Sequence, residues 1–592
     1  MVVLEARLAR VDEIADRTVA GWTVPGLAYG VVVDGELRHA RGLGTLRVGE
    51  SATPDADSVF RIASMTKSFT AAVVLALRDE GRLGLDDPVA RHLPRLRELR
   101  GPTADSPPIT IRHLLTMTAG FPTDDPWGDR QQGLDLDAFI DLVAGGLSFA
   151  WAPGVRFEYS NLGYGLLGRV ITAVAGREYR DVVRERLLQP LGMASTGYLE
   201  SEVPASRLAR GYVWRDGAFL EEPMDGYGAL ASMGGIFTTV RDLSIWVRGF
   251  IDAFPPRDAP GRAEAWSAGH PLGRASRREM QQPMVAFEPE LVQAAPDAEP
   301  QIEGGAYGFG LFVEPHARWG RLVGHSGGYP GFGSNMRWHP SSGLGVIVLA
   351  NGRYAPAAVL GREMIVALLE AEAAPTRRVV ATPATLDARA AIERLIEAWD
   401  EDLADRVFAM NVDLDEPLAR RRATLEGLRS IHGPLLPDPD EATVSRSPFN
   451  LEWWLRGERG RVKLEILLDP ELPPRVQALT VTSVPEPPAE LTRIAGLLAA
   501  RLAAGETSWP ADLELEAPLD GAALGRSMRA TEARFGPVRL GPVVAGDGRQ
   551  SATFRLDGER GRLELVLDRD PLTGRLRTVA LRPVPLSPPD LA

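Results

Sequence analysis

A serine and a lysine stand three residues apart in a chain that contains only two lysines. Residues 60–70 are Phe-Arg-Ile-Ala-Ser-Met-Thr-Lys-Ser-Phe-Thr, which places Ser64 three positions before Lys67, and all but two of the 66 lysine and arginine residues are arginine. Arginine cannot replace lysine as a proton acceptor, because its pKa is too high for it to become neutral. Burial and nearby charge can bring a lysine close to neutrality. We therefore predict that Lys67 is a base for the nucleophile Ser64.

The stretch that follows has the apolar spacing of a helix that is buried on most sides, from Ser64 to Glu80. Ser64 would stand at its start, in the positive field of the helix N-terminus, and Lys67 would lie one turn on along the same face. The alternative is a capping serine with a surface lysine. The apolar flanks disfavour it, because an amino group is costly to bury without a function.

A second candidate group is Tyr159-Ser160-Asn161. A tyrosine can pass on a proton when neighbouring cations lower its pKa, and Lys67 could supply that charge. Asn161 offers a donor and an acceptor, which is enough to hold a substrate amide and Lys67 together. The alternative is a loop tyrosine followed by an asparagine that caps the next helix.

A third group is His325-Ser326-Gly327-Gly328, which follows a predicted short strand at a sheet edge, residues 320–324. Paired glycines let a substrate approach the backbone and leave N–H groups free to hold an oxyanion. The alternative is a glycine-rich turn. Residues 324–328 also fit G-x-S-x-G, the nucleophile elbow of α/β-hydrolases, but an elbow must lead into a helix, and Tyr329-Pro330-Gly331-Phe332-Gly333 does not favour one.

The composition excludes several kinds of function. The chain has 592 residues, 44% of them hydrophobic and 24% charged, as expected for two to four globular domains. Its net charge of −13 disfavours nucleic-acid and anionic-membrane partners. With no cysteine and no clustered histidines, we expect no metal and no cofactor. We see neither a signal peptide nor an apolar run that could span a membrane, so we expect a cytoplasmic protein.

Residues 1–375 are predicted to form one mixed α/β domain. We expect an antiparallel sheet whose first and last strands are neighbours, because strands are predicted at both ends of the region with helices between them. Residues 254–305 are interpreted as an insertion or cap over the site. The predicted elements are a helix at 5–20, strands at 27–33 and 37–42 joined by an Asp34-Gly35 hairpin, a buried strand at 344–350 and a last helix at 357–371.

After a proline-containing linker, the chain repeats itself. The run Leu-Arg-Gly-Glu-Arg-Gly-Arg at 455–461 recurs as Leu-Asp-Gly-Glu-Arg-Gly-Arg at 556–562. We predict two small α+β modules, residues 384–485 and 488–592, that mediate self-association or protein contacts. The second lysine, Lys463, corresponds to Glu564 in the other copy, so we place it on the wet face of a strand and assign it no chemistry.

In their order and spacing, the three groups resemble the motifs of the serine β-lactamase and penicillin-binding-protein superfamily. S-x-x-K is the nucleophile motif of that superfamily, Y-x-N is similar to the second motif of its class C and esterase-like branches, and H-x-G stands where many members have K-T-G. The segments 109–120, 232–239 and 307–310 are also similar, so the resemblance covers residues 15–370. It implies a β-lactamase-like α/β (α+β) domain, an antiparallel sheet with flanking helices plus an all-helical part.

The resemblance implies acyl transfer. Ser64 would attack a carbonyl while Lys67 and Tyr159 share the proton, and water would release the acyl-enzyme. Backbone N–H groups of Ser64 and Gly328 would form the oxyanion hole. His325 would orient Tyr159 or the substrate, and the substrate site would also include Asn161, Ser326 and Gly327.

The departures from the family pattern shift the expected substrate. His325 in place of a lysine weakens the positive charge that anchors a carboxylate, which favours esters, amides or D-amino-acid peptides over penicillins. Met117 stands where the family often has histidine, and we assign it no role. The alternative function is a non-catalytic scaffold or binding protein that keeps the fold and carries two interaction modules.

Overall fold

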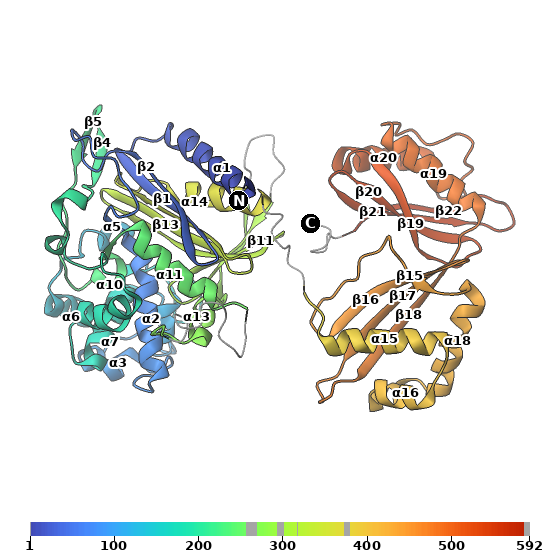
Figure 1. Cartoon of the computed structure of the whole chain (residues 1–592), viewed down its shortest axis with the longest axis horizontal. Helices are drawn as coiled ribbons and strands as arrows, with labels where there is room; N and C mark the ends of the chain where they lie inside the picture. The colour runs from blue at the N-terminus through green and yellow to red at the C-terminus, as the bar shows by residue number, and fades with distance from the viewer. Residues whose placement is uncertain (1, 256–268, 293–300, 317, 372–378, 585–592) are drawn as a thin grey trace. The chain divides into compact units, whose positions relative to one another are not determined.

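The structure is a computed structural model that describes residues 2–255, 269–292, 301–316, 318–371 and 379–584. The chain divides into two compact units, Met1–Pro375 and Thr376–Ala592 (Figure 1). Within the described ranges, no helix combines the length and the apolar character that crossing a membrane requires.

The first unit is built on an antiparallel sheet of eight strands. The first and last long strands pair along their whole length, with Leu27 opposite Ala350 and Val33 opposite Leu344, so the predicted neighbourhood and the predicted hairpin are both confirmed. In order across the sheet, the strands are β2 (Glu36–Gly44), β1 (Gly26–Val33), β14 (Leu344–Ala350), β13 (Phe332–His339), β12 (Gly320–Tyr329), β11 (Phe312–His316), β10 (Ala306–Tyr307) and β7 (Val285–Ala286).

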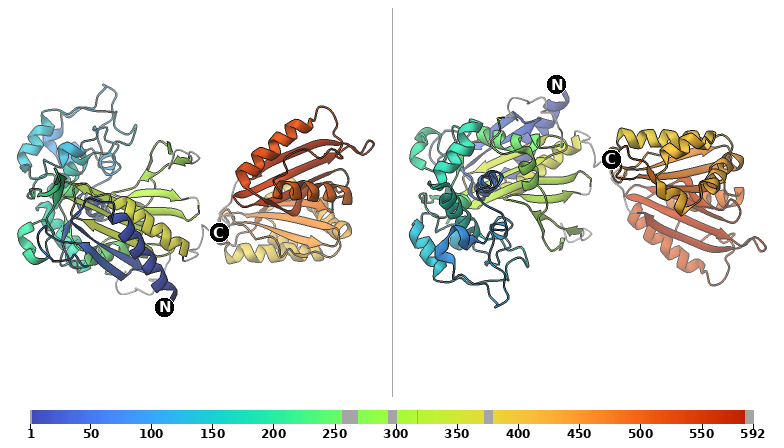
Figure 2. Two further views of the ribbon diagram at one scale, coloured as in Figure 1. Left: turned by 90° about the horizontal axis from the view of Figure 1, so that it is seen from above. Right: turned by 90° about the horizontal axis from the view of Figure 1, so that it is seen from below.

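Helices cover both faces of this sheet. Helices α1 (Val2–Val19) and α14 (Ala357–Ala371) pack against each other and on one face, which confirms the two predicted terminal helices (Figures 1 and 2). Helix α11 (Val240–Asp252) lies on the other face, so close to β1 that a side chain at Gly30 would collide with Val240. Because both faces are buried, β1 and β14 are apolar along almost their whole length instead of alternating.

The all-helical part surrounds α2 (Thr66–Asp79), in which all but the last two residues are buried. A short 3₁₀ turn, η1 (Ala63–Met65), precedes α2, so the predicted helix is present but begins two residues after Ser64. Around α2 lie α3 (Val89–His92), α4 (Ile111–Leu115), α5 (Asp125–Gly128), α6 (Leu136–Ala144), α7 (Asn161–Ala175), α8 (Tyr179–Val183), α9 (Gln189–Leu191) and α10 (Ala231–Gly234).

Strand β12 differs from its prediction as a short edge strand. It continues to Tyr329, because the glycines of residues 324–328 extend the strand and do not form a turn. It lies inside the sheet, between β11 and β13. Its pairing with β11 ends where Gly324 faces Phe312, so residues 325–329 have one edge that β11 does not cover. A second strand, β13, follows β12 and no helix does, which contradicts the nucleophile-elbow alternative.

The segment 254–305 is described only in part, since residues 256–268 and 293–300 lie outside the described ranges. Its described part contains α13 (Arg274–Met280), β7 at the edge of the main sheet, and the paired strands β8 (Glu290–Val292) and β9 (Gln301–Glu303). A role as a cap over the site therefore stays a prediction.

The second unit contains two α+β modules with the same helix-then-meander order, which confirms the two α+β modules predicted from the internal repeat. Each packs its helices on one face of its own four-stranded antiparallel sheet and has its own apolar core. The first contains α15 (Pro383–Glu397), α16 (Glu401–Val407), α17 (Met410–Asp415), α18 (Leu418–His432), β15 (Leu436–Pro437), β16 (Asn450–Gly457), β17 (Gly460–Leu468) and β18 (Val476–Pro485). The second contains α19 (Ala489–Ala503), α20 (Gly521–Phe535), β19 (Val538–Gly546), β20 (Ser551–Gly558), β21 (Gly561–Arg569) and β22 (Leu576–Val584).

A partly buried carboxylate ties the two modules together. Glu441 of the first module accepts hydrogen bonds from Arg461 of the same module at 2.7 Å and from Arg555 of the second at 2.9 Å. Arg461 also donates to the Val543 carbonyl oxygen of the second module at 3.0 Å. Lys463 is half-buried on β17 and pairs with Glu452 at 2.9 Å, a structural contact between neighbouring strands.

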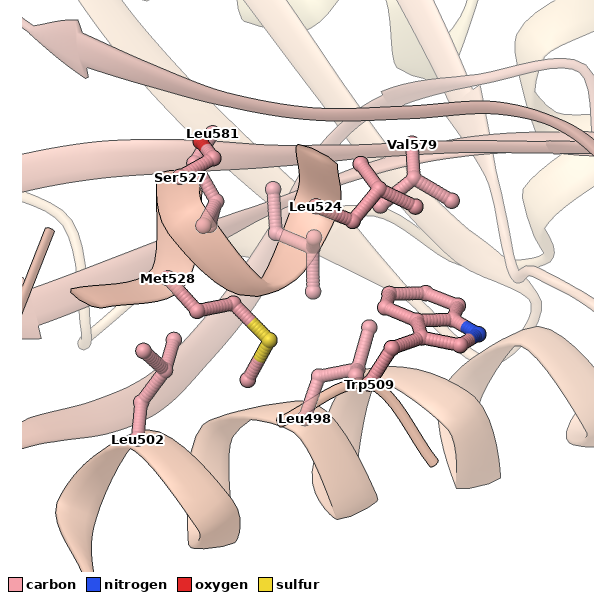
Figure 3. A pocket seen from close by; sticks show the side chains of 9 residues that line it. Leu498, Leu502, Trp509, Leu524, Ser527, Met528, Val579 and Leu581 are labelled. Atoms are coloured by element: carbon pink, nitrogen blue, oxygen red, sulfur yellow. The ribbon is translucent and has the colours of Figure 1, made fainter. Parts of the chain in front are cut away.

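The second module has an apolar pocket between its two helices and its sheet (Figure 3). Leu498 and Leu502 of α19 face Leu524 and Met528 of α20 across it, and Trp509 closes one side. The indole N–H of Trp509 donates to the Leu513 carbonyl oxygen at 3.0 Å, so it is not available to a ligand. The pocket is therefore packing space with almost no polar lining.

We expect each compact unit to fold by itself, because each has separate apolar cores. Residues 1–375 and 376–592, expressed as separate chains, should each show a cooperative thermal transition that coincides with one transition of the full chain in calorimetry. Aggregation of either fragment under conditions where the full chain is folded would contradict this division.

Candidate active site

Ser64 lies on a tight turn that the main sheet holds in place. The residue before it, Ala63, has a φ of 46°, a left-handed conformation that costs an ordinary residue about 1–2 kcal/mol. Strand β12 packs directly on this turn, and a side chain at Gly327 would collide with the Ile62 carbonyl oxygen. Ser334 of β13 donates to that same oxygen at 2.8 Å. Packing against two strands therefore keeps the strained turn, and with it Ser64, in a fixed position.

The fully buried amino group of Lys67 lies among three oxygen atoms. Its Nζ is 2.9 Å from Ser64 Oγ, 2.7 Å from Asn161 Oδ1 and 3.0 Å from the Met233 carbonyl oxygen. The amide and backbone oxygens can only accept hydrogen bonds. A neutral amine has two N–H groups and one lone pair, so these two oxygens take both N–H groups and the lone pair faces the Ser64 hydroxyl. This is the geometry that a general base needs.

The surroundings of Lys67 lower its pKa toward neutral pH. Burial lowers the pKa of Lys67 to about 8, against the opposing negative charges of Asp125, Asp129 and Asp124. A group with a pKa near 8 is neutral in part of the molecules at neutral pH, which an exposed lysine is not. The same residue therefore has both the position and the pKa of a base.

Two aspartates that sequence analysis missed hold the second motif against Lys67. Asp125 Oδ1 accepts a hydrogen bond from Asn161 Nδ2 at 2.7 Å. Asp124 accepts from the backbone N–H groups of Asn161 at 2.6 Å and Leu162 at 2.8 Å, at the start of α7. Asp124 precedes the short helix α5 and Asp125 is its first residue, distant in sequence from all three motifs, and no local pattern around them signals this contact.

Tyr159 lies beside the nucleophile, but its electrostatics differ from the prediction. Its ring centre is 5.0 Å from Lys67 Nζ. Burial and the negative charge of Asp125 raise the pKa of Tyr159 well above its ordinary value, while a hydrogen bond with Ser64 lowers it to a smaller extent. The expectation that Lys67 lowers this pKa was therefore wrong. Tyr159 keeps its proton at rest, and so it can donate a proton but cannot serve as the resting base.

His325 is buried and has both ring nitrogens engaged. Its Nδ1 donates to the Ser326 carbonyl oxygen at 2.6 Å, so its Nε2 accepts from the Tyr307 hydroxyl at 3.1 Å. Burial, with the charge of Lys67, lowers the pKa of His325 to about 3. The predicted role of orienting Tyr159 or the substrate does not fit, because a neutral ring with both nitrogens engaged has no donor left for either.

The residues Ser326, Gly327 and Gly328 of β12 differ in their exposure. Gly327 is buried and allows close packing on the turn that bears Ser64. Ser326 and Gly328 are partly exposed and lie on the stretch of β12 whose edge β11 leaves uncovered. Strand β12 packs against η1, the turn that bears Ser64. An oxyanion site formed by the backbone N–H groups of Ser64 and Gly328 stays our prediction.

The geometry predicts a pH dependence set by Lys67. Only neutral Lys67 can accept the Ser64 proton, so the rate of p-nitrophenyl acetate hydrolysis should rise with pH through about 8 and then level off. Lys67→Arg should lose about 10²–10⁴-fold in rate, because the guanidinium keeps its proton.

The second lysine supplies a matched control for this measurement. Lys463→Arg removes the other lysine from a strand of the second unit, and it should leave both the rate and the pH profile unchanged. A Lys67→Arg variant with the wild-type rate would show that Lys67 contributes only its charge.

Comparison with known proteins places this site in a family. The model of the Beta-lactamase family matches residues 11–370, more than half of the chain. The D-alanyl-D-alanine-carboxypeptidase/endopeptidase AmpH of Escherichia coli K12 is 32% identical over 253 residues, which are 41% of this chain and 62% of that protein. Protein flp of Staphylococcus aureus NCTC 8325 is 26% identical over 345 residues, 58% of this chain and 62% of that protein. The chain thus spans 62% of the length of these curated relatives.

A solved structure extends the similarity in fold beyond the first unit. The octameric penicillin-binding protein homologue from Pyrococcus abyssi aligns over 95% of this chain and 96% of its own, with a TM-score of 0.52 and 18% identity. At this identity, the alignment supports the fold alone. The family match, the S-x-x-K geometry and the antiparallel sheet agree, and the chain belongs to the beta-lactamase family.

Proposed function

We propose that this protein is a serine hydrolase that acts through an acyl-enzyme on Ser64. The observation that carries the proposal is the arrangement around Lys67, whose two other oxygen partners leave its lone pair for the Ser64 hydroxyl. A scaffold without activity would gain nothing from burying a lysine beside a serine, because the burial is costly.

The proposed reaction uses each group in one step. Neutral Lys67 accepts the proton of Ser64 as Oγ attacks the substrate carbonyl carbon. Backbone N–H groups of Ser64 and Gly328 hold the oxyanion, and Tyr159 donates its proton to the leaving group while Lys67 returns a proton to Tyr159. Water then attacks the acyl-enzyme with the same base, and Ser64 regains its proton.

The proposed substrates are small esters, amides or D-amino-acid peptides. Two observations support uncharged groups near β12. His325 is neutral and has no free donor, so it cannot bind a carboxylate as an ammonium would. Phe312, partly exposed, lies 4.9 Å from His325 and 6.5 Å from Tyr159 between ring centres, and it belongs to an aromatic cluster with Phe157, Phe287 and Tyr307.

We propose a separate role for residues 384–485 and 488–592. Their duplicated fold, joined through Glu441, supports accessory modules that mediate self-association or protein contacts. The relative from Pyrococcus abyssi that aligns over both units is described as octameric, which agrees with self-association.

The nucleophile can be identified by labelling. A fluorophosphonate should add one adduct to the wild-type chain in intact-protein mass spectrometry, and Ser64→Ala should abolish it, because Ser64 Oγ lies 2.9 Å from the buried amino group of Lys67, which can activate it as a nucleophile. Ser326→Ala should retain the adduct and serves as the control at the other serine of the site.

Two other labelling results would contradict the proposal. An adduct that disappears only in Ser326→Ala would reject Ser64 as the nucleophile. A wild-type chain that takes up no adduct and hydrolyses no ester would favour the scaffold alternative.

A further inference from the structure

We propose that Asp125 is a positioning residue that fixes which end of the Asn161 side chain faces Lys67. The inference rests on the proposed function, since it concerns how the base of that reaction is prepared. Asp125, Asn161, Lys67 and Ser64 form an unbroken chain of hydrogen bonds, with lengths of 2.7, 2.7 and 2.9 Å.

The two ends of the Asn161 amide have opposite hydrogen-bonding character. Its oxygen accepts and its NH₂ group donates. The carboxylate of Asp125 can only accept, so it requires the NH₂ group on its own side. The amide oxygen is thereby turned toward Lys67, where it accepts one of the N–H groups of the amine.

A reversed amide would disable the base. The NH₂ group of Asn161 would then face Lys67 Nζ and would donate to the lone pair of the neutral amine. That lone pair is the one that must accept the Ser64 proton, so the nucleophile and the amide would compete for it. The carboxylate prevents this competition through its hydrogen bond with Asn161.

Asp124 has a different task, although it is the neighbouring residue. It accepts from two backbone N–H groups at the start of α7, so it secures the position of the helix rather than the orientation of the amide. The pair thus separates two requirements, since Asp124 places Asn161 and Asp125 orients its side chain.

Asp125 also contributes to the charge that Lys67 experiences. Among the described residues, the titratable or charged groups that face Lys67 or its carboxylates come from several elements: Asp124, Asp125, Asp129, Tyr159, Tyr164, His325, Tyr354 and Arg61. Asp125 is the largest of the charges that raise the pKa of Lys67. Its loss should therefore lower that pKa.

The test compares pH profiles of ester hydrolysis by the full chain. Asp125→Asn should reduce kcat/KM for p-nitrophenyl acetate by about 10–100-fold, the usual effect of removing a group that orients a catalytic one. At the same time, the rising limb of its profile should move to lower pH by about one unit, because a negative charge near Lys67 is gone. A merely structural loss would lower the rate without moving the limb.

Three further variants make the test specific. Asp125→Glu keeps a carboxylate that can only accept hydrogen bonds. This variant should therefore retain most of the wild-type kcat/KM, and the rising limb of its pH profile should lie at the wild-type pH. In an Asn161→Ala background, Asp125→Asn should cost little more in kcat/KM, because its effect passes through the amide. Asp135→Asn is the matched control, since Asp135 is also a carboxylate at a helix start, on α6, and should leave the profile unchanged.

The outcomes separate this inference from the proposed function. A wild-type chain that neither hydrolyses the ester nor takes up a fluorophosphonate on Ser64 refutes the proposed function. If the wild-type chain is active and Asp125→Asn changes neither kcat/KM nor the pH of the rising limb, only the proposed role of Asp125 is refuted. Equal losses of kcat/KM from Asp125→Asn with and without Asn161 would likewise show that Asp125 does not act through the amide.

Discussion

The burial of one amino group, that of Lys67, is the constraint on which the rest of the first unit depends. Removing an ammonium group from water is costly unless polar partners replace the water. The three oxygens around Nζ supply those partners, and they come from η1, α7 and α10. Three elements distant in sequence must therefore meet at one atom, and the cores on both sides of the sheet hold them there.

Burial also gives this site its chemistry. The low-dielectric surroundings lower the pKa of Lys67 to about 8, while nearby carboxylates limit the shift. Without the carboxylates, the amine would lose its proton too readily to return it to Tyr159 and the leaving group; without burial, it would remain charged. Burial also keeps Tyr159 protonated, so in the proposed reaction the two residues begin in complementary states, Lys67 as proton acceptor and Tyr159 as proton donor.

The sequence predicted the parts of the fold that local patterns determine. The Asp34-Gly35 hairpin, the strand at 344–350 and the terminal helices follow from turn chemistry and apolar periodicity. The motifs also indicated which residues meet at the site. Contacts made through space left no local signal: Asp125 reaches Asn161 across 36 positions, and His325 loses its charge because Tyr307 and its own strand enclose it. In the sequence, the glycines at 327–328 are compatible with a turn. In the structure they continue strand β12, and the absence of a side chain at Gly327 lets the turn that bears Ser64 pack directly against this strand.

The electrostatics of the site connect the proposed mechanism with the proposed substrates. A second cation at position 325 would repel the charge of Lys67, which already contributes to the low pKa of His325. With a neutral imidazole there, the carboxylates of Asp124, Asp125 and Asp129 outnumber the cations of Lys67 and Arg61, and the site becomes more negative when Lys67 gives up its proton. The site is thus most anionic in the protonation state that starts the reaction. A substrate carboxylate beside the scissile bond would be repelled at that moment, whereas a neutral ester or amide would not.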